Sequence, residues 1–282
     1  MHGTAISCLD DRRATTAPGT GFLRIARHGR RSVVSRAFAS SPLKLLTPRN
    51  HGCGAWIYTS TYGGGLVDRD ALRLHAQIDE GASAFLSTQA ATKVYRSPNG
   101  TSADFHATVG GGGVLVSLPD PVICFASSRY RQTQRFDLAE SASLVLLDWM
   151  SSGRRESGER WTFDRYSTRI TVRCEDRLVV YDALSLDSLD GDLADRMGRF
   201  DVFAIVVLTG PALRDHAERA VARVASMPVP SRSDLLISAS PLAGGAIIRA
   251  AGVSIEAVGR ALRAHLTFVP ALLGDDPSAR KW

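Results

Sequence analysis

The sequence lacks long apolar runs and paired cysteines. Its longest purely apolar run, Val202 to Leu208, has the length of a buried strand and is far too short for a membrane-spanning helix. There is no secretory h-region, so we expect a cytoplasmic protein with no membrane partner. No C-x-x-C pair occurs, which argues against a zinc ribbon, an iron–sulfur site or a disulfide scaffold. The four cysteines are widely spaced: Cys8, Cys53, Cys124 and Cys174.

One of these cysteines has a histidine close by in the sequence. Cys53 stands in the segment His51-Gly52-Cys53-Gly54, where a soft metal would find one thiolate and one imidazole. The same residues are also typical of a glycine-rich loop that binds nothing. We interpret the cysteines as small buried hydrophobic residues.

Common catalytic motifs are absent as well. The chain contains no G-x-x-x-x-G-K-[ST], no G-x-G-x-x-G after a strand, no H-E-x-x-H and no G-x-S-x-G, and its seven histidines are isolated. The glycine run at 110–113 lacks the lysine and following helix of a phosphate loop, so we predict a hairpin turn there. A hydrolase whose triad assembles from distant residues remains the alternative function.

Most of the chain has no surplus of positive charge. The formal net charge is +6, yet residues 1–50 hold nine basic and two acidic side chains, so the remainder carries −1. Nucleic-acid binders spread basic groups over a recognition face, and this distribution disfavours a nucleic-acid partner. Within the basic segment, Leu23 and Ile25 alternate with arginine before a turn at His28-Gly29, which predicts a hairpin rather than a transit peptide. Residues 1–18 show no periodicity and are predicted to be loose.

What the sequence does contain is a repeating strand pattern. Alternating apolar runs flank tight turns that begin near residues 80, 111, 140 and 175, a spacing of about 30 residues. Period-two alternation buries one face of each strand. We therefore predict a mostly β fold: residues 19–185 form a stacked β-sheet or β-solenoid-like body, with a conventional sandwich as the alternative.

The last third of the chain changes character. A buried strand at Val202 to Leu208 precedes a helix opened by Pro211, and two short strands precede a second helix capped by Ser254. We predict that residues 186–282 form a smaller α+β portion packed on the β body as one structural unit.

Two carboxylates follow apolar strand residues directly. Asp148 comes after Leu144 to Leu147, and Asp182 comes after Leu178 to Tyr181. A buried carboxylate is costly unless it is paired or solvated, so each either begins a turn at a strand end or lines a wet internal passage. Candidate cationic partners lie shortly after Asp148: Arg154, Arg155 and Arg160.

Polar side chains are dense between Leu86 and Arg96, and again between Gly153 and Trp161. The pattern of the first segment predicts a strand end that is followed either by a solvated loop or by a functional segment. We predict that the two segments form one structural knot between sheet layers, in which a carboxylate holds Lys93 or Arg154.

Several segments together resemble the urease accessory protein UreD family, also called UreH. The matching segments occur in register from about residue 20 to the C terminus: 41–45, 63–67, 88–96, 118–121 and 153–159. The residues that carry these motifs are Gly64, Gly65, Thr88, Gln89, Thr92, Lys93, Tyr95, Arg96, Pro119, Asp120, Gly153, Arg154, Gly158 and Glu159.

The resemblance implies a mostly β stacked fold and a scaffold with no catalytic residues and no tightly bound cofactor. It implies that the protein binds UreF, the GTPase UreG through UreF, and apo-urease, and that nickel(II) passes in transit along an internal wet path. Positions that match the family's proposed path are Asp70, Asp148 and Asp182. Ala71 stands where the family carries an acidic residue, and Phe268-Val269-Pro270 lacks the arginine that relatives often place before this proline.

Overall fold

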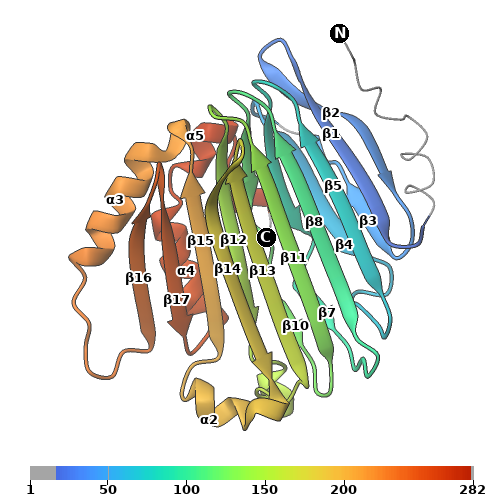
Figure 1. The fold of residues 1–282 in the computed structure, drawn as a ribbon, viewed down its shortest axis with the longest axis vertical. Coiled ribbons are helices and arrows are strands. Elements are labelled where there is room, and N and C mark those ends of the chain that lie inside the picture. The colour runs from blue at the N-terminus through green and yellow to red at the C-terminus, as the bar shows by residue number, and fades with distance from the viewer. Residues whose placement is uncertain (1–16, 50, 281–282) are drawn as a thin grey trace.

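Two large β-sheets stacked face to face make up most of the molecule (Figure 1). The computed structural model describes residues 17–49 and 51–280, so nearly all of the segment predicted to be loose, residues 1–18, lies outside the described residues. Within that part of the chain the predicted mostly β fold is confirmed.

The first sheet, sheet A, has seven strands. Five neighbouring strands run parallel, and each of the two edge strands is antiparallel to its neighbour. In spatial order the strands are β14 (Arg177–Asp187), β13 (Arg165–Cys174), β11 (Arg129–Leu138), β8 (Thr101–Val109), β5 (Ala71–Ile78), β1 (Thr20–His28) and β2 (Arg31–Ala39).

The second sheet, sheet B, has ten strands. Its main path is β16 (Leu235–Leu242), β17 (Gly245–Gly252), β15 (Val202–Thr209), β12 (Ser143–Ser151), β9 (Val114–Ser117), β6 (Ser83–Thr88), β4 (Ala55–Thr61) and β3 (Leu43–Leu46). Two short strands extend it beside β12: β10 (Val122–Cys124) and β7 (Thr92–Val94).

The repeated turns connect the two sheets instead of closing hairpins. The chain passes from β5 to β6, from β8 to β9 and from β11 to β12, each time leaving sheet A and entering sheet B. The turns stack on one another, since the Gly81 amide donates to the Gly111 carbonyl at 2.9 Å. We call this end of the molecule the arch end and the opposite end the loop end. The alternation of apolar and polar residues predicted from the sequence is retained, because each strand beside an arch points its apolar side chains into the space between the sheets.

One prediction about the turns is therefore wrong. The glycine run at 110–113 is an arch and not a hairpin turn, because β8 and β9 lie in different sheets. A side chain at Gly110 would place its Cβ 2.9 Å from the Glu80 amide nitrogen, so the stacking of turns requires glycine there. The turn near 175 is the exception to the repeat, since β13 and β14 pair as a true hairpin within sheet A.

The predicted N-terminal hairpin is confirmed. Strands β1 and β2 pair antiparallel around Gly29, whose φ of 60° is in the left-handed region that favours glycine. On its other side β1 joins β5 in parallel, which fixes the hairpin to sheet A. The basic segment is thus part of the folded body from residue 20 onward.

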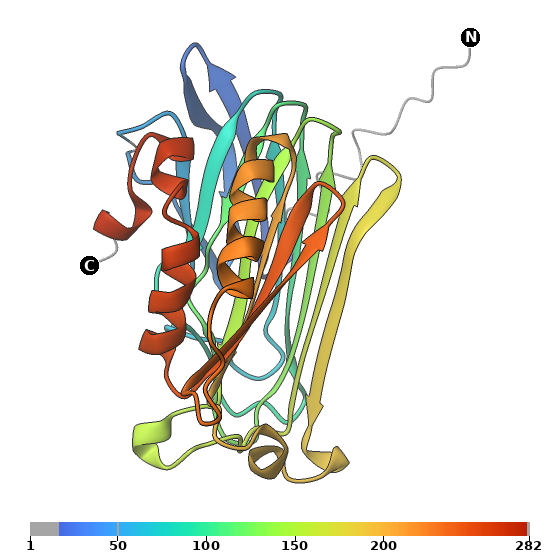
Figure 2. The ribbon, with the colours of Figure 1, turned by 90° about the vertical axis from the view of Figure 1, so that its left-hand side faces the viewer.

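The C-terminal third continues sheet B and covers it. Strands β15, β17 and β16 extend the sheet antiparallel beyond β12. The longer helices pack on the outer face of this sheet, as Figure 2 shows, whereas no helix of the described residues covers the outer face of sheet A. The helices are α2 (Leu193–Met197), α3 (Arg214–Ala225), α4 (Ile255–His265) and α5 (Val269–Leu273), with short 3-10 turns at Arg155–Ser157, Ser188–Asp190, Pro211–Leu213 and Pro277–Arg280. The predicted cap is present, since Ser254 Oγ accepts the Ala257 amide at 3.1 Å.

The segment around Cys53 joins the N-terminal hairpin to helix α5 near the C terminus. The amides of Cys53 and Gly54 donate to the Leu273 carbonyl at 2.9 and 3.1 Å, and the Ser32 amide donates to the Cys53 carbonyl at 2.7 Å. A Cβ on Gly52 would lie 2.2 Å from the same Leu273 oxygen, so this approach needs glycine. Here the His51–Gly54 segment is a structural clamp on α5. Among the described residues no group of three or more His, Cys, Asp and Glu side chains is arranged to hold a metal ion.

Candidate functional site

All of the family-like polar segments meet at the loop end. Segments 63–67, 89–100, 118–128 and 152–164 connect strands whose other ends form the arches. The Leu66 amide donates to the Lys93 carbonyl at 2.8 Å, and the Tyr95 amide donates to the Leu66 carbonyl at 2.9 Å. At Gly65, an added Cβ would lie 2.6 Å from the Tyr95 ring. These segments therefore form one continuous layer in which small residues are needed for close approach.

The second polar segment, Gly153–Trp161, joins this layer through a cation and two rings. Arg154 forms an ion pair with Glu159 and lies over the Phe125 ring at 4.2 Å from its centroid. Phe125 meets Tyr95 edge to face with centroids 5.2 Å apart. The hydrogen bond from Arg154 is the largest influence on Glu159 and lowers the pKa of its carboxyl. Of the two cations that we expected a carboxylate to hold, Arg154 has such a partner, whereas Lys93 is exposed and forms no ion pair with any described residue.

Several of the remaining motif residues form hydrogen bonds that hold the loop end together. Thr88 Oγ1 accepts the Asp120 amide at 2.8 Å and donates to the Asp120 carboxylate at 3.1 Å. The Thr92 amide donates to the Pro121 carbonyl, and the carbonyl of Pro119 accepts the Trp149 indole N–H at 2.8 Å. Gly64, Gly153 and Gly158 have positive φ angles, while the side chains of Gln89 and Arg96 are exposed.

Asp148 is one of two aspartates that the fold buries almost completely, the other being Asp201. Only 4% of Asp148 is exposed, and it points from β12 toward sheet A. Gln132 Nε2 donates to one carboxylate oxygen at 2.8 Å, and Thr168 Oγ1 donates to the other at 2.9 Å. Both partners are neutral, so the charge of the ionised form is solvated by dipoles alone.

The pKa of Asp148 follows from these surroundings. Burial has the largest influence and raises the pKa of the carboxyl above its ordinary value. The hydrogen bonds from Thr168 and Gln132 lower it in part, and the negative charge of Asp182 raises it again. The protonated form is thus favoured more than in an exposed aspartate.

Two cavities, both partly open to solvent, share Asp148 in their walls. The first, of about 140 Å³, lies between the sheets toward the loop end, and its lining includes Thr88, Asp120 and Gln132. The second, of about 500 Å³, extends from Asp148 and Thr168 to Asp182 and Arg249. Gln134 also lines the first cavity and is buried, and its side chain interacts with Asp148 and lowers the pKa of that carboxyl.

The prediction that nearby arginines pair with Asp148 or Asp182 is wrong. None of the three predicted arginines reaches Asp148 or Asp182. Arg155 and Arg160 instead form ion pairs with Asp201, a buried carboxylate beside β15, at 2.8 and 2.6 Å. Asp182 forms an ion pair with Arg249 of β17.

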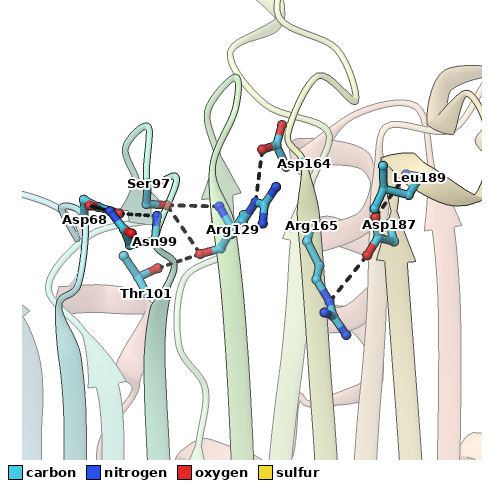
Figure 3. Close-up of polar contacts among 9 residues, drawn as sticks. All are labelled: Asp68, Ser97, Asn99, Thr101, Arg129, Asp164, Arg165, Asp187 and Leu189. Atoms are coloured by element: carbon cyan, nitrogen blue, oxygen red, sulfur yellow. Dashed lines mark hydrogen bonds and ion pairs between the residues drawn. The ribbon is translucent and has the colours of Figure 1, made fainter.

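Asp70 lies apart from the other two aspartates. Its carboxylate accepts the Val67 amide at 2.9 Å and faces a groove of about 520 Å³ at the loop end of sheet A. Four arginines line this groove, Arg69, Arg129, Arg131 and Arg165. Figure 3 shows two of them in ion pairs with Asp164 and Asp187, at 3.2 and 3.7 Å. So many guanidinium groups near one carboxylate disfavour the binding of a metal cation there.

One buried residue connects the groove to the cavities. Tyr130 lines both the groove at Asp70 and the first cavity, and its hydroxyl donates to Gln132 Oε1 at 2.9 Å. Burial raises the pKa of Tyr130 well above its ordinary value, so the phenol stays protonated. Tyr130 is therefore a wall between the outer groove at Asp70 and the first of the two cavities that meet at Asp148.

The sequence analysis did not identify several of the residues that contact these aspartates and arginines. Gln132 and Thr168 are inward-facing polar residues in otherwise apolar alternation, a signal that was available. Arg249 and Asp201 carried no such signal, because their partners are 67 and about 41 to 46 residues away in the chain.

The fold and the site together define a protein of arched, mostly parallel strands, whose two sheets hold a buried carboxylate between two cavities with mainly apolar walls. A sequence model described as UreD urease accessory protein matches residues 18–282. The chain therefore belongs to the UreD urease accessory protein family, and this membership supports a role in urease maturation.

Individual relatives agree. The chain is 52% identical to "Urease accessory protein UreD" of Sorangium cellulosum over 96% of its own length and 86% of the relative. It is 43% identical to the protein of the same name from Anaeromyxobacter sp., over 93% and 89% of the two chains. It is also 34% identical to "Urease accessory protein D" of Oryza sativa subsp. indica, over 94% and 96%. In the described part of the chain, no helix has the length and apolar character that crossing a membrane would require.

Proposed function

We propose that this protein is a non-catalytic, cytoplasmic scaffold of urease maturation that passes nickel(II) toward the enzyme. In this proposal it binds UreF, reaches the GTPase UreG through UreF, and docks on apo-urease. Nickel is cargo and not a resident cofactor. The observation that carries the proposal is the placement of Asp148, which lies in the walls of both cavities.

The donor groups that line these cavities suit a site that must release the nickel ion it binds. Nickel(II) accepts carboxylate and water oxygens but binds imidazole more tightly. The cavity linings contain aspartates, amides and hydroxyls and neither histidine nor cysteine. Because burial raises the pKa of Asp148, a metal ion competes with a proton for this carboxylate, which weakens its grip further.

A double substitution tests the proposal in cells. Asp148→Asn with Asp182→Asn removes both internal carboxylates with little change in volume. Co-expressed with urease and its other accessory proteins, this variant should leave purified urease with less nickel, measured by mass spectrometry, and with proportionally lower activity. The matched control is Asp137→Asn, since Asp137 lies on sheet A and lines neither of these two cavities.

A pull-down separates loss of nickel passage from loss of assembly. The double variant should capture UreF and apo-urease as well as the unchanged chain does. Undiminished nickel content in urease from cells with the double variant would refute the nickel path. A chain that stays soluble alone and captures neither partner would refute the scaffold and favour an independent enzyme.

A further inference from the structure

The second cavity opens where the two sheets differ in width. Sheet A ends at its edge strand β14, whereas sheet B continues past β12 through β15, β17 and β16. Near the arch end the inner faces of β15 and β17 pack against β13 and β14, and near Asp148 β15, β17 and β16 line the cavity together with β14. This side of the inter-sheet space is its mouth.

A single ion pair spans this mouth. Asp182 of β14 binds Arg249 of β17, and among residues 17–49 and 51–280 this is the one ion pair that joins a strand of sheet A to a strand of sheet B. The Asp182 side chain is 21% exposed and that of Arg249 is 51% exposed. The pair thus lies between bulk solvent and the interior.

Register places the same pair close to the buried carboxylate. Asp148 is opposite Ile205 in β15, and Ile205 is opposite Arg249 in β17, so all three share one face of sheet B. Two strand spacings amount to about 10 Å. The charge of Asp182 acts on Asp148 across the cavity. The arginine therefore neutralises one of two carboxylates that face a common space.

We propose that Arg249 is an internal counter-ion that gates this mouth: its guanidinium occupies Asp182, and a divalent cation must displace it to use that carboxylate. This inference rests on the proposed function and adds a control on entry to and exit from the second cavity. With Arg249 in place the two aspartates and the arginine sum to one negative charge. With Arg249 turned outward the two carboxylates match the charge of one divalent ion.

The exposure of Arg249 makes such displacement inexpensive. A half-exposed ion pair contributes little to stability, because water solvates both groups when they separate. Arginine remains charged at all relevant pH values, so the gate responds to a competing cation and not to protonation of the guanidinium. Its long, flexible stem lets the head move into solvent without any change in β17.

Nickel binding by the purified chain tests the gate. The full-length chain, kept in complex with whichever accessory partner holds it in solution, is titrated with nickel(II) ions in a calorimeter. Arg249→Gln removes the charge but keeps a hydrogen-bond donor for Asp182, and Arg249→Met removes both. Each should bind nickel about fivefold more tightly, the factor expected from a pair of this exposure. Arg249→Lys should bind as the unchanged chain does.

Two further variants decide the interpretation. Arg249→Gln combined with Asp182→Asn should lose the gain, because the freed carboxylate is its source. Arg169→Gln is the matched control, since Arg169 is an exposed arginine of β13 that points away from the cavities. Circular dichroism and a melting temperature for each variant show that the fold is kept, and the Arg249→Gln result stands if Arg249→Met does not fold.

The outcomes separate the gate from the proposed function. Unchanged nickel affinity in both Arg249→Gln and Arg249→Met, with weaker binding in Asp148→Asn, would overturn the gate and leave the path intact. Equal affinity in the unchanged chain, in Asp148→Asn and in Arg249→Gln would overturn both. A gain in Arg249→Gln that disappears in the double variant supports both.

Discussion

The two halves of the space between the sheets differ, although the same strands build both. Along β11 the inward-facing residues change from Tyr130, Gln132 and Gln134 near the loop end to Phe136 and Leu138 near the arch end. Strand β13 changes in the same order, from Tyr166 and Thr168 to Ile170 and Val172. The arch half is a continuous apolar core, and the other half holds the cavities and Asp148.

This difference teaches how a solenoid-like core accommodates a buried carboxylate. Strand alternation alone decides which residues point inward, and it is the same in both halves. A polar inward residue is tolerated where its neighbours on adjacent strands supply hydrogen bonds, as Gln132 and Thr168 do for Asp148. The loop half also has a buried apolar cluster of its own, which includes Trp161, Phe163 and Leu186.

The largest expected effect comes from removing a ring in the arch half. Phe136→Ala leaves a void among fully buried neighbours and should lower the free energy of unfolding by about 3–5 kcal/mol. Urea denaturation followed by circular dichroism measures this loss. A cost near that of an exposed substitution would show that the arch half is not the stabilising core.

A smaller effect is expected in the polar half. Thr168→Val keeps the shape but leaves one oxygen of Asp148 without its donor, which should cost about 1–3 kcal/mol. Thr171→Val on the same strand is the matched control, because Thr171 is opposite the exposed Tyr181 and lies in the outward alternation. If both variants lost equal stability, the hydrogen bond to Asp148 would have no measurable role.

The smallest effect has the opposite sign. The pKa of Asp148 is raised in the folded state, so its contribution to stability is fully present below the unfolded value of 3.8 and is lost as pH rises through the folded pKa. Asp148→Asn should therefore slightly stabilise the protein at pH 7. The difference should shrink as the pH falls toward 4. Melting temperatures at several pH values test this, and a variant that is less stable at pH 7 would contradict it.

The strands were more predictable than their pairing. The spacing of the turns near residues 80, 111 and 140 gave the stacked body, because alternation and turn chemistry are local signals. Whether two strands at a turn form a hairpin or face each other across a core is decided by contacts far away in the chain. The glycine run at 110–113 looks the same in both cases, and for that reason its prediction failed.

The residues of the candidate site also differ in how well the sequence predicts them. Asp148 and Asp182 stand out in the sequence because each interrupts an apolar strand. Their partners do not, since Thr168 is 20 residues from Asp148 and Arg249 is 67 residues from Asp182. The arginines near Asp148 in sequence bind elsewhere because the chain leaves β12 at the loop end before it reaches them. Proximity in sequence is a poor guide to ion pairs in a fold whose neighbours are about 30 residues apart.

The clamp around Cys53 has a consequence for the order of folding during synthesis. The arches can stack one after another as they leave the ribosome, because each needs only the strands already made. The amides of Cys53 and Gly54 must wait for the Leu273 carbonyl, which is translated some 220 residues later. The side of the stack at Cys53 therefore lacks these hydrogen bonds until translation is nearly complete. A nascent chain arrested before α5 would expose that side to the folding machinery of the cell.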